Sequence, residues 1–212
     1  MKFHRKDIQK FKIENTENIE KMSSKKFDPK KLKKLNDPAR KQFQDPDLIW
    51  KALNLKDPEV LIDIGAGTGF FAIPFSEKMG RGKVYACDIS EEMVTWMQQN
   101  ISGIRQVPIV PMLVAESKIS LDSGVADLVY MVNLHHELER PLDTLSDALR
   151  LLKTGGKMMI IDWKNEETPG GPPLSIRIDV SMIENQLKKC GFAHISVHDI
   201  LPYHCFITAE KS

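Results

Sequence analysis

The sequence has few cysteines, and no two of them lie close together along the chain. Cys87, Cys190 and Cys205 are widely spaced, and no two form a C-x-x-C motif. An odd number at such spacing argues against a disulfide framework and against a zinc or redox motif. We therefore expect a reducing, cytoplasmic setting and no metal site.

The sequence also lacks long apolar segments. No apolar run approaches the roughly 20 residues that cross a bilayer, and the polar start, Met-Lys-Phe-His-Arg-Lys, does not predict a secretory signal. A length of 212 residues with 42% hydrophobic content is enough for one domain with a sizeable core and an appendage. This ordinary composition argues against wholesale disorder and against a fibrous fold.

Charge is unevenly distributed along the chain. Residues 1–41 hold 14 Lys/Arg and 6 Asp/Glu, whereas the other residues hold 16 and 23. We expect a basic N-terminal arm and helical cap or lid over 1–54 and a second domain over 55–212. Two interpretations of the arm stay open: a solvated, lysine-rich helix, or a surface that attracts nucleic acid or an anionic substrate.

Proline and glycine positions divide the chain. Asp-Pro pairs at 28–29, 37–38 and 45–46 favour turns or helix starts, which predicts short helices near 30–35, 38–43 and 46–54. From Val60 onward, apolar segments alternate with segments of helical periodicity. The expected strands are 60–64, 83–87, 109–114, 127–133 and 157–162, and the expected helices run up to 79 and over 91–100, 142–152 and 180–190.

Two strands near 193–199 and 203–210 close the chain as an antiparallel pair. Pro111 in the third strand favours an edge position, and Gly155-Gly156 are expected to stop the helix over 142–152. Strands that alternate with helices predict an α/β fold, a doubly wound, mainly parallel, Rossmann-like sheet.

The strongest motif is Asp63-Ile64-Gly65-Ala66-Gly67-Thr68-Gly69, between the first strand and a helix. Ligands of open parallel sheets bind beyond the carboxyl ends of the strands, and glycines let the backbone come close to a ligand. An acidic Asp63 would repel a pyrophosphate and hold an ammonium group. The dinucleotide pattern also requires glycine at position 70, where this chain has Phe70.

Asp88 ends the second strand, where a carboxylate can accept both hydroxyls of a ribose. Together with D-x-G-x-G-x-G, this resembles the class I S-adenosylmethionine-dependent methyltransferases. Ala115-Glu116-Ser117, Asn133-Leu134-His135-His136 and the Leu151–Lys157 turn resemble further segments of that family, so the resemblance covers about residues 58–165. It implies the sheet order 3-2-1-4-5-7-6 with strand 7 antiparallel.

The resemblance implies S-adenosyl-L-methionine as cofactor and S-adenosyl-L-homocysteine as product. The residues that it places against the cofactor are Asp63, Gly65, Ala66, Gly67, Gly69, Asp88, Ile89, Met93, Glu116, Ser117 and Asn133. Ser117 stands where many relatives have an acid that holds the adenine amine.

The acceptor is less well indicated. The chain is most similar to small-molecule methyltransferases related to the quinone-biosynthesis type, but it lacks that group's Arg-Asn pair after the fourth strand. An Asn/Asp-Pro-Pro-aromatic segment for base methylation is also absent, and the cysteine spacing does not favour arsenite methylation. We therefore expect methyl transfer to O, N or S of a small molecule. An RNA- or protein-directed enzyme that docks through residues 1–41 and a non-catalytic cofactor-binding protein stay open, as does the oligomeric state.

A hydroxyl acceptor needs a base, and histidine is the usual one near neutral pH. His135 and His136 follow the fourth strand, and Asp162 ends the fifth, where it could orient a histidine. Since adjacent residues point in different directions, only one histidine is expected to face the acceptor, and we favour His136. The alternative is that both histidines are packing or loop residues.

Overall fold

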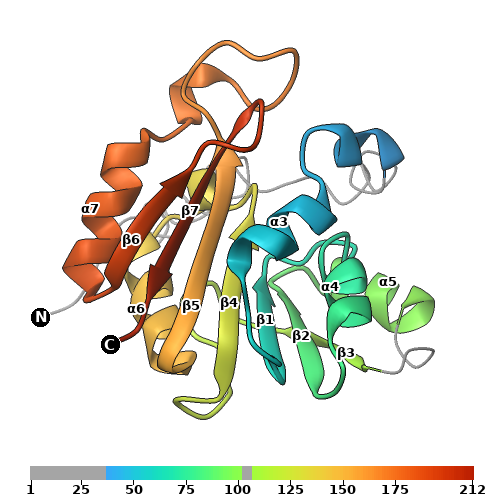
Figure 1. Cartoon of the computed structure of the whole chain (residues 1–212). Coiled ribbons are helices and arrows are strands. Elements are labelled where there is room, and N and C mark those ends of the chain that lie inside the picture. The colour runs from blue at the N-terminus through green and yellow to red at the C-terminus, as the bar shows by residue number, and fades with distance from the viewer. Residues whose placement is uncertain (1–36, 102–106) are drawn as a thin grey trace, which may run out of the picture. The chain divides into compact units, whose positions relative to one another are not determined.

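The computed structural model describes residues 37–101 and 107–212, all within one compact unit, Leu32–Ser212. In this part of the chain a seven-stranded sheet has the order β3-β2-β1-β4-β5-β7-β6, as Figure 1 shows. The strands are β1 (Val60–Ile64), β2 (Lys83–Asp88), β3 (Ile109–Leu113), β4 (Ala126–Val132), β5 (Leu152–Trp163), β6 (Ala193–His198) and β7 (His204–Glu210).

Strand directions follow from the connections. β1, β2, β3, β4 and β5 pair in parallel, while β7 pairs antiparallel with both β5 and β6. The expected order and the antiparallel seventh strand are thus confirmed. β3 is an edge strand, where the missing N–H of Pro111 disrupts no inner ladder.

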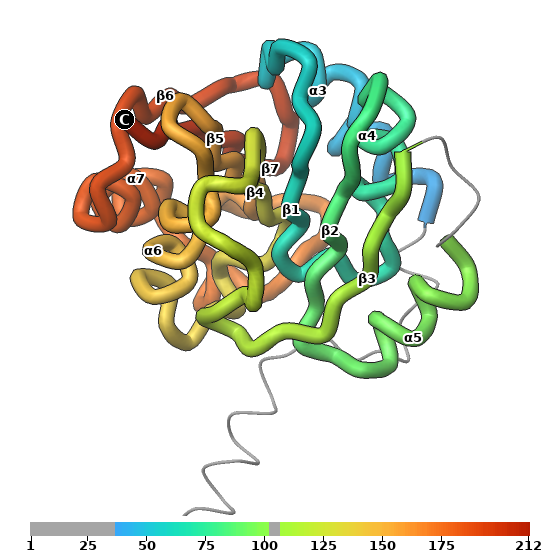
Figure 2. The backbone as a smooth tube through the Cα atoms, turned by 90° about the horizontal axis from the view of Figure 1, so that it is seen from below, coloured from blue at the N-terminus to red at the C-terminus, as the bar shows by residue number. Residues whose placement is uncertain are grey.

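Helices cover both faces of the sheet, as Figure 2 shows for α3 and α4 against α6 and α7. The side chains of β1 alternate between the faces, with Leu61 in one apolar cluster and Ile62 in the other. The helices are the 3-10 helix η2 (Pro38–Gln42), α3 (Pro46–Leu53), α4 (Ala72–Lys78), α5 (Glu91–Asn100), the 3-10 helix η3 (His135–Glu137), α6 (Pro141–Leu151), the 3-10 helix η4 (Leu174–Ile176) and α7 (Val180–Cys190).

The helix α3 is part of the core, not merely a cover. Its Ile49 and Leu53 are fully buried in the cluster formed with α4 and the sheet, and Lys157 of β5 donates a hydrogen bond to the carbonyl of Leu53 at 2.9 Å. The expected helix over 46–54 is confirmed to within one residue. The division into 1–54 and 55–212 stays a prediction, since residues 1–36, with the expected helix at 30–35, lie outside the described residues.

One expected strand start is wrong. The helix predicted over 142–152 is confirmed to within one residue as α6, but the strand expected from 157 already begins at Leu152. Gly155-Gly156, expected to stop the helix, lie within β5 instead, where Gly155 donates its N–H to the carbonyl of Lys211 at 2.8 Å. Pairing with the C-terminal segment therefore extends β5 back to the end of the helix.

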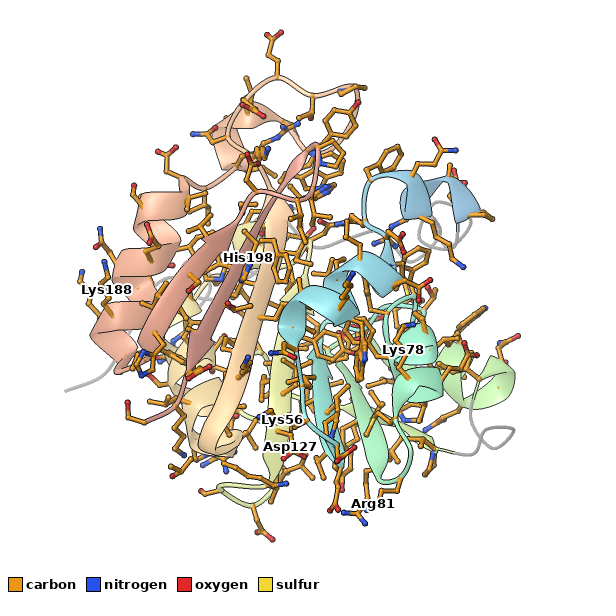
Figure 3. All side chains as sticks on the ribbon, in the orientation of Figure 1. Lys56, Lys78, Arg81, Asp127, Lys188 and His198 are labelled. Carbon is orange, nitrogen blue, oxygen red and sulfur yellow. The ribbon has the colours of Figure 1, made fainter. Side chains whose placement is uncertain are left out.

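The two ends of the parallel strands have different roles. At the amino-terminal end, the carboxylate of Asp127 accepts the N–H groups of Glu59 and Val60 and pairs with Lys153, and Figure 3 shows Asp127 there with Arg81 and Lys56. These contacts fasten the strands together. The carboxyl ends of β1, β2, β4 and β5 meet at the opposite edge, where the site described next is built.

Candidate functional site

The glycine loop follows β1 with a backbone that only small residues tolerate. Gly65, Gly67 and Gly69 have φ angles of 72°, 57° and 76°, a region that L side chains disfavour. A Cβ at Gly65 would lie 2.7 Å from Leu134, and one at Gly69 would lie 2.5 Å from Ile101. The loop therefore turns closely over the sheet edge.

Asp88 connects the glycine loop to the end of β2. One of its carboxylate oxygens accepts the N–H of Gly67 at 2.8 Å, and the other accepts the N–H of Ser90 at 2.9 Å. Burial raises the pKa of Asp88, although these backbone donors oppose the shift. The backbone N–H of Ile89 also acts on this carboxylate, and since a carboxylate has about four acceptor positions, capacity for a further hydrogen bond is left.

Asp63 is a buried acid without a cationic side chain bonded to it among the described contacts. Its side chain is 3% exposed, and burial raises its pKa to about 8, with Asp88 adding to the shift and the Tyr130 hydroxyl and Arg40 opposing it. A cation placed beside Asp63 would favour the ionised form. The position thus suits a ligand with an ammonium group.

Two residues in the N-terminal part of the site, Arg40 and Gln44, were not predicted from the sequence. The guanidinium of Arg40 lies over the Phe70 ring, 4.1 Å from its centroid, and donates to the side chain of Gln44 at 3.3 Å. The side-chain amides of Gln44 and Asn133 bond reciprocally, at 3.0 and 3.2 Å. Gln44 and Asn133 are 89 positions apart, so no local pattern signals their contact.

The other predicted cofactor residues lie around this edge with different surroundings. Ala66 and Met93 are buried, whereas Ile89 is 40% exposed. Ser117 is half-buried. Glu116 uses one carboxylate oxygen to accept the N–H groups of Glu139 and Arg140, at 2.9 and 3.3 Å, so part of that side chain fastens the chain ahead of α6.

His136 and Asp162 form a close pair. Nδ1 of His136 lies 2.7 Å from Oδ1 of Asp162, and the backbone N–H of His136 donates to Oδ2 at 2.9 Å. The imidazole is 5% exposed, and its Nε2 lies 3.7 Å from the carboxylate of Glu137. Burial lowers the pKa of His136, but Asp162 and Glu137 raise it more, so the net shift is upward.

His135 points elsewhere. It is fully buried, and its Nε2 lies 2.7 Å from the side-chain oxygen of Gln186 on α7. Burial lowers its pKa, which keeps the ring neutral. Of the two histidines, His136 is therefore the one paired with a carboxylate.

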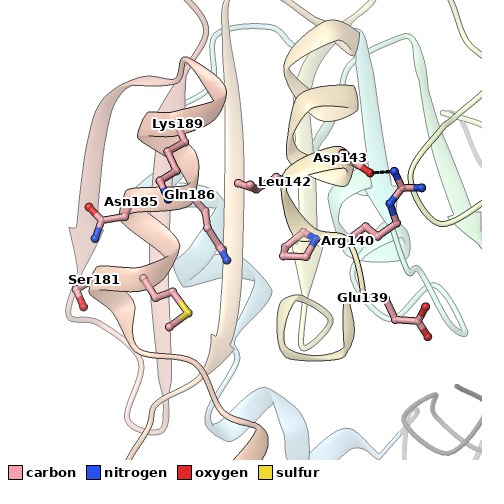
Figure 4. Close-up of a pocket in the computed structure, with 10 residues that line it drawn as sticks. Glu139, Arg140, Leu142, Asp143, Ser181, Asn185, Gln186 and Lys189 are labelled. Carbon is pink, nitrogen blue, oxygen red and sulfur yellow. Dashed lines mark ion pairs between the residues drawn. The ribbon is translucent and has the colours of Figure 1, made fainter. Parts of the chain in front are cut away.

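A groove of about 710 Å³ lies between the start of α6 and α7, as the close-up in Figure 4 shows. Arg140 and Leu142 line one side, and Met182, Gln186 and Lys189 line the other. None of the predicted cofactor or catalytic residues lines it. Among the described residues, the groove is linked to the site by Gln186, which bonds to His135, and by the N–H groups of Glu139 and Arg140, which bond to Glu116.

The described residues contain neither a cluster of metal ligands nor a membrane-spanning helix. Over 37–101 and 107–212, no group of three or more His, Cys, Asp or Glu side chains could hold a metal ion. Within the same residues no helix is both long and apolar enough to traverse a bilayer.

Known proteins resemble the chain in the part that carries these residues. The model of a family described as "Methyltransferase domain" matches residues 62–160. The chain is 33% identical to an S-adenosylmethionine-dependent methyltransferase from Aquifex aeolicus, whose crystal structure it matches with a TM-score of 0.83 over 88% of this chain and 100% of that one.

Two more distant relatives share less of their length. Ubiquinone/menaquinone biosynthesis C-methyltransferase UbiE of Laribacter hongkongensis is 27% identical over 131 residues, 58% of this chain and 53% of that protein. The chain thus spans about half the length of the curated relatives of this kind. Human N-acetylserotonin methyltransferase, solved with S-adenosylmethionine, is 20% identical with a TM-score of 0.65 over 79% of this chain and 52% of that one, a likeness of fold alone.

The whole of the Aquifex relative matches 88% of this chain, and the matched family model begins within β1 and spans the glycine loop, Asp88 and the His136 segment. On this ground the chain belongs to the S-adenosylmethionine-dependent methyltransferases, and S-adenosylmethionine is the cofactor of its family.

Proposed function

We propose that the protein binds S-adenosylmethionine across the carboxyl ends of β1, β2 and β4 and transfers its methyl group to a small-molecule acceptor. One observation carries the proposal: Asp63, Asp88 and the Gly65–Gly69 loop lie at one sheet edge, linked by the Gly67–Asp88 hydrogen bond. Such a site fits this cofactor in three ways. One acid suits its ammonium group, the other suits its ribose diol, and the glycine loop lets the backbone come close to it.

Each acid then has its own role. Asp88 accepts hydrogen bonds from the ribose hydroxyls with the acceptor capacity that its backbone donors leave open. Asp63 holds the cofactor's ammonium group, directly or through water, and becomes ionised when it does so.

Arg40 holds the carboxylate of the cofactor's methionyl part. Burial lowers the pKa of Arg40 to about 10, with Asp63 and Asp37 opposing the shift, so it is charged at neutral pH. It lies over Phe70, the residue directly after Gly69. Arginine forms bidentate pairs with carboxylates, and the zwitterionic end of the cofactor would thus lie between Arg40 and Asp63.

The cofactor supplies an activated methyl group on a sulfonium, so the protein must align the acceptor and remove its proton. Asp162 accepts a hydrogen bond from the Nδ1–H group of His136. The lone pair of Nε2 is therefore left free to act as the base. His135, held by Gln186, anchors the loop and does not take part.

A second candidate is an RNA-directed enzyme, favoured by the excess of Lys and Arg over residues 1–41. In one experiment, release of S-adenosylhomocysteine is measured with a small-molecule extract, with RNA and with protein, for the full chain and for a variant without residues 1–26.

Release with the small-molecule extract alone, unchanged in the shortened chain, supports the proposal. Release with RNA that falls steeply with salt and is lost in the shortened chain supports the second candidate. Cofactor binding without release in any arm favours a non-catalytic protein.

A further inference from the structure

His204, the first residue of β7, is buried in an unusual way. It is fully buried, and among the described residues neither of its ring nitrogens has a hydrogen-bond partner. Its only close ring contact is the tilted indole of Trp163, with centroids 4.2 Å apart. Buried polar atoms are almost always bonded, so an unbonded pair on one side chain calls for a ligand that is bound at another stage of the function.

The charges around His204 are mainly positive. Burial, together with the charges of Arg40, Arg177 and Lys164, lowers its pKa to about 4, and Asp162 alone opposes the shift. Asp162 is already occupied by His136. The ring is therefore neutral at pH 7 and offers one N–H donor in a field of positive charge.

Two of these cations have little compensating charge of their own. Arg177 lies 5.4 Å from the centroid of the Trp163 ring. Among the described residues it donates hydrogen bonds to backbone carbonyls, those of Pro172, Lys164, Glu166 and Gly170. Lys164 lies 3.4 Å from Asp199, whose side chain is 93% exposed. Such an exposed pair contributes little, so the region has capacity for an anion.

The position suits an acceptor. His204 pairs with Trp163 in the β5–β7 ladder, and the preceding residue, Asp162, holds the proposed base. Trp163 and His204 share the sheet face of Ile161 and Phe206, which is also the face covered by α3. Asp162 has the parity of the opposite face, that of Ile160, but both positions lie at the carboxyl end of β5, where Asp162 is near enough to raise the pKa of His204. A small molecule bound across this edge can have its reacting atom at His136 and a second group at His204.

We propose that the methyl acceptor carries an oxyanion, a carboxylate or a phosphate, that binds to His204 with Lys164 and Arg177 supplying the attracting charge. This inference rests on the proposed function, because it names a class of substrate for the same site. The anion would accept the ring N–H and neutralise the local positive charge.

The test is an NMR titration of protein labelled with ¹⁵N-histidine, alone and with S-adenosylhomocysteine, at constant ionic strength. The probes are acetate, inorganic phosphate and uncharged acetamide, and His204→Phe identifies the His204 signals. We expect acetate or phosphate to move these signals saturably and to raise the pKa of His204 by about one to three pH units. Acetamide should leave these signals unchanged. The anion that binds more tightly identifies the acceptor's charged group as a carboxylate or a phosphate.

Two variants make the test specific. Lys164→Met should weaken anion binding several-fold, whereas Lys189→Met, in the groove on the other face, should leave it unchanged. No saturable response to either anion, an equal response to acetamide, or equal weakening by both variants would overturn the inference. Binding of S-adenosylhomocysteine is measured on the same samples, so loss of that binding counts against the proposed function, while its presence without an anion response counts only against this inference.

Discussion

Asp162 contacts His136 twice: its Oδ1 lies 2.7 Å from the imidazole Nδ1, and its Oδ2 accepts the backbone N–H of the same residue at 2.9 Å. The carboxylate therefore determines both the ring orientation and the tautomer, which leaves Nε2 as the basic nitrogen. Replacing His136 by Gln should lower kcat by about 10²- to 10⁴-fold, the usual contribution of a general base, without changing cofactor affinity. His198→Gln, a histidine on β6 labelled in Figure 3, is the control and should retain full activity.

The same pair predicts a pH profile. Burial lowers the pKa of His136, but Asp162 and Glu137 outweigh it and Arg177 opposes them only partly, so the pKa lies above 6.5. The base must be deprotonated, so kcat should rise with pH with a midpoint above 6.5. Asp162→Asn should move that midpoint to lower pH and lower the plateau rate. A midpoint that does not move would show that Asp162 does not act on the base.

The contribution of His136 to the free energy of unfolding should fall as the pH rises, whereas kcat should rise. Because the folded-state pKa of His136 is raised, its stabilising contribution is complete below the unfolded pKa and is lost as the pH rises through the folded pKa. Asp162→Asn should remove this part of the pH dependence of the free energy of unfolding.

Cofactor affinity should depend on pH through Asp63. With its pKa near 8 in the free protein, Asp63 must lose a proton to hold the cofactor's cation, so affinity should rise with pH by up to about tenfold per pH unit below 8. Calorimetric titrations at several pH values measure this slope. Asp63→Asn should abolish it, and Asp122→Asn, at an exposed loop position, should preserve it. Equal slopes in the two variants would contradict the assignment.

The glycine loop gives a prediction with a matched control. Gly67 has a φ of 57°, and its N–H donates to Asp88, so Gly67→Arg should abolish S-adenosylmethionine binding while most of the secondary structure survives. Gly80→Arg places the same side chain where an added Cβ meets nothing within 4 Å, and its affinity should be unchanged. Retained affinity in Gly67→Arg would count heavily against this cofactor site.

The role of α3 is tested by stability. Leu53 is fully buried in the core, so Leu53→Ala should lower the free energy of unfolding by about 2–5 kcal/mol in urea denaturation. Leu48 on the same helix is 41% exposed, and Leu48→Ala should change it by less than about 0.5 kcal/mol. An equally small effect of Leu53→Ala would mean that α3 is a detachable cover.

Much of the fold was predictable because local patterns determine it. β1, the glycine loop and α5 follow from an apolar run, from glycines and from Ser90, whose side chain caps α5 by accepting the N–H of Met93. Gly191 likewise ends α7 in the left-handed conformation that glycine favours. The start of β5 was not predictable, because pairing of Gly155 with Lys211 extends the strand, and that contact is distant in sequence.

The site was predictable where motifs and strand ends carry it, which includes the pairing of His136 with Asp162. Asp63, the glycines and Asp88 lie in one motif and at the next strand end, where the parallel topology brings them together. Arg40 and Gln44 reach the site through long-range contacts of a short 3-10 helix, and the surroundings of His204 depend on pairing between β5 and β7. No spacing in the sequence encodes these contacts.

The most direct test of the central claim is a calorimetric titration of the purified full chain with S-adenosylmethionine, with NADH as the control ligand. We predict saturable binding of one S-adenosylmethionine per chain at micromolar concentration and no binding of NADH, because Phe70 stands where the dinucleotide motif needs glycine. Binding of NADH alone, or of neither ligand, would contradict it.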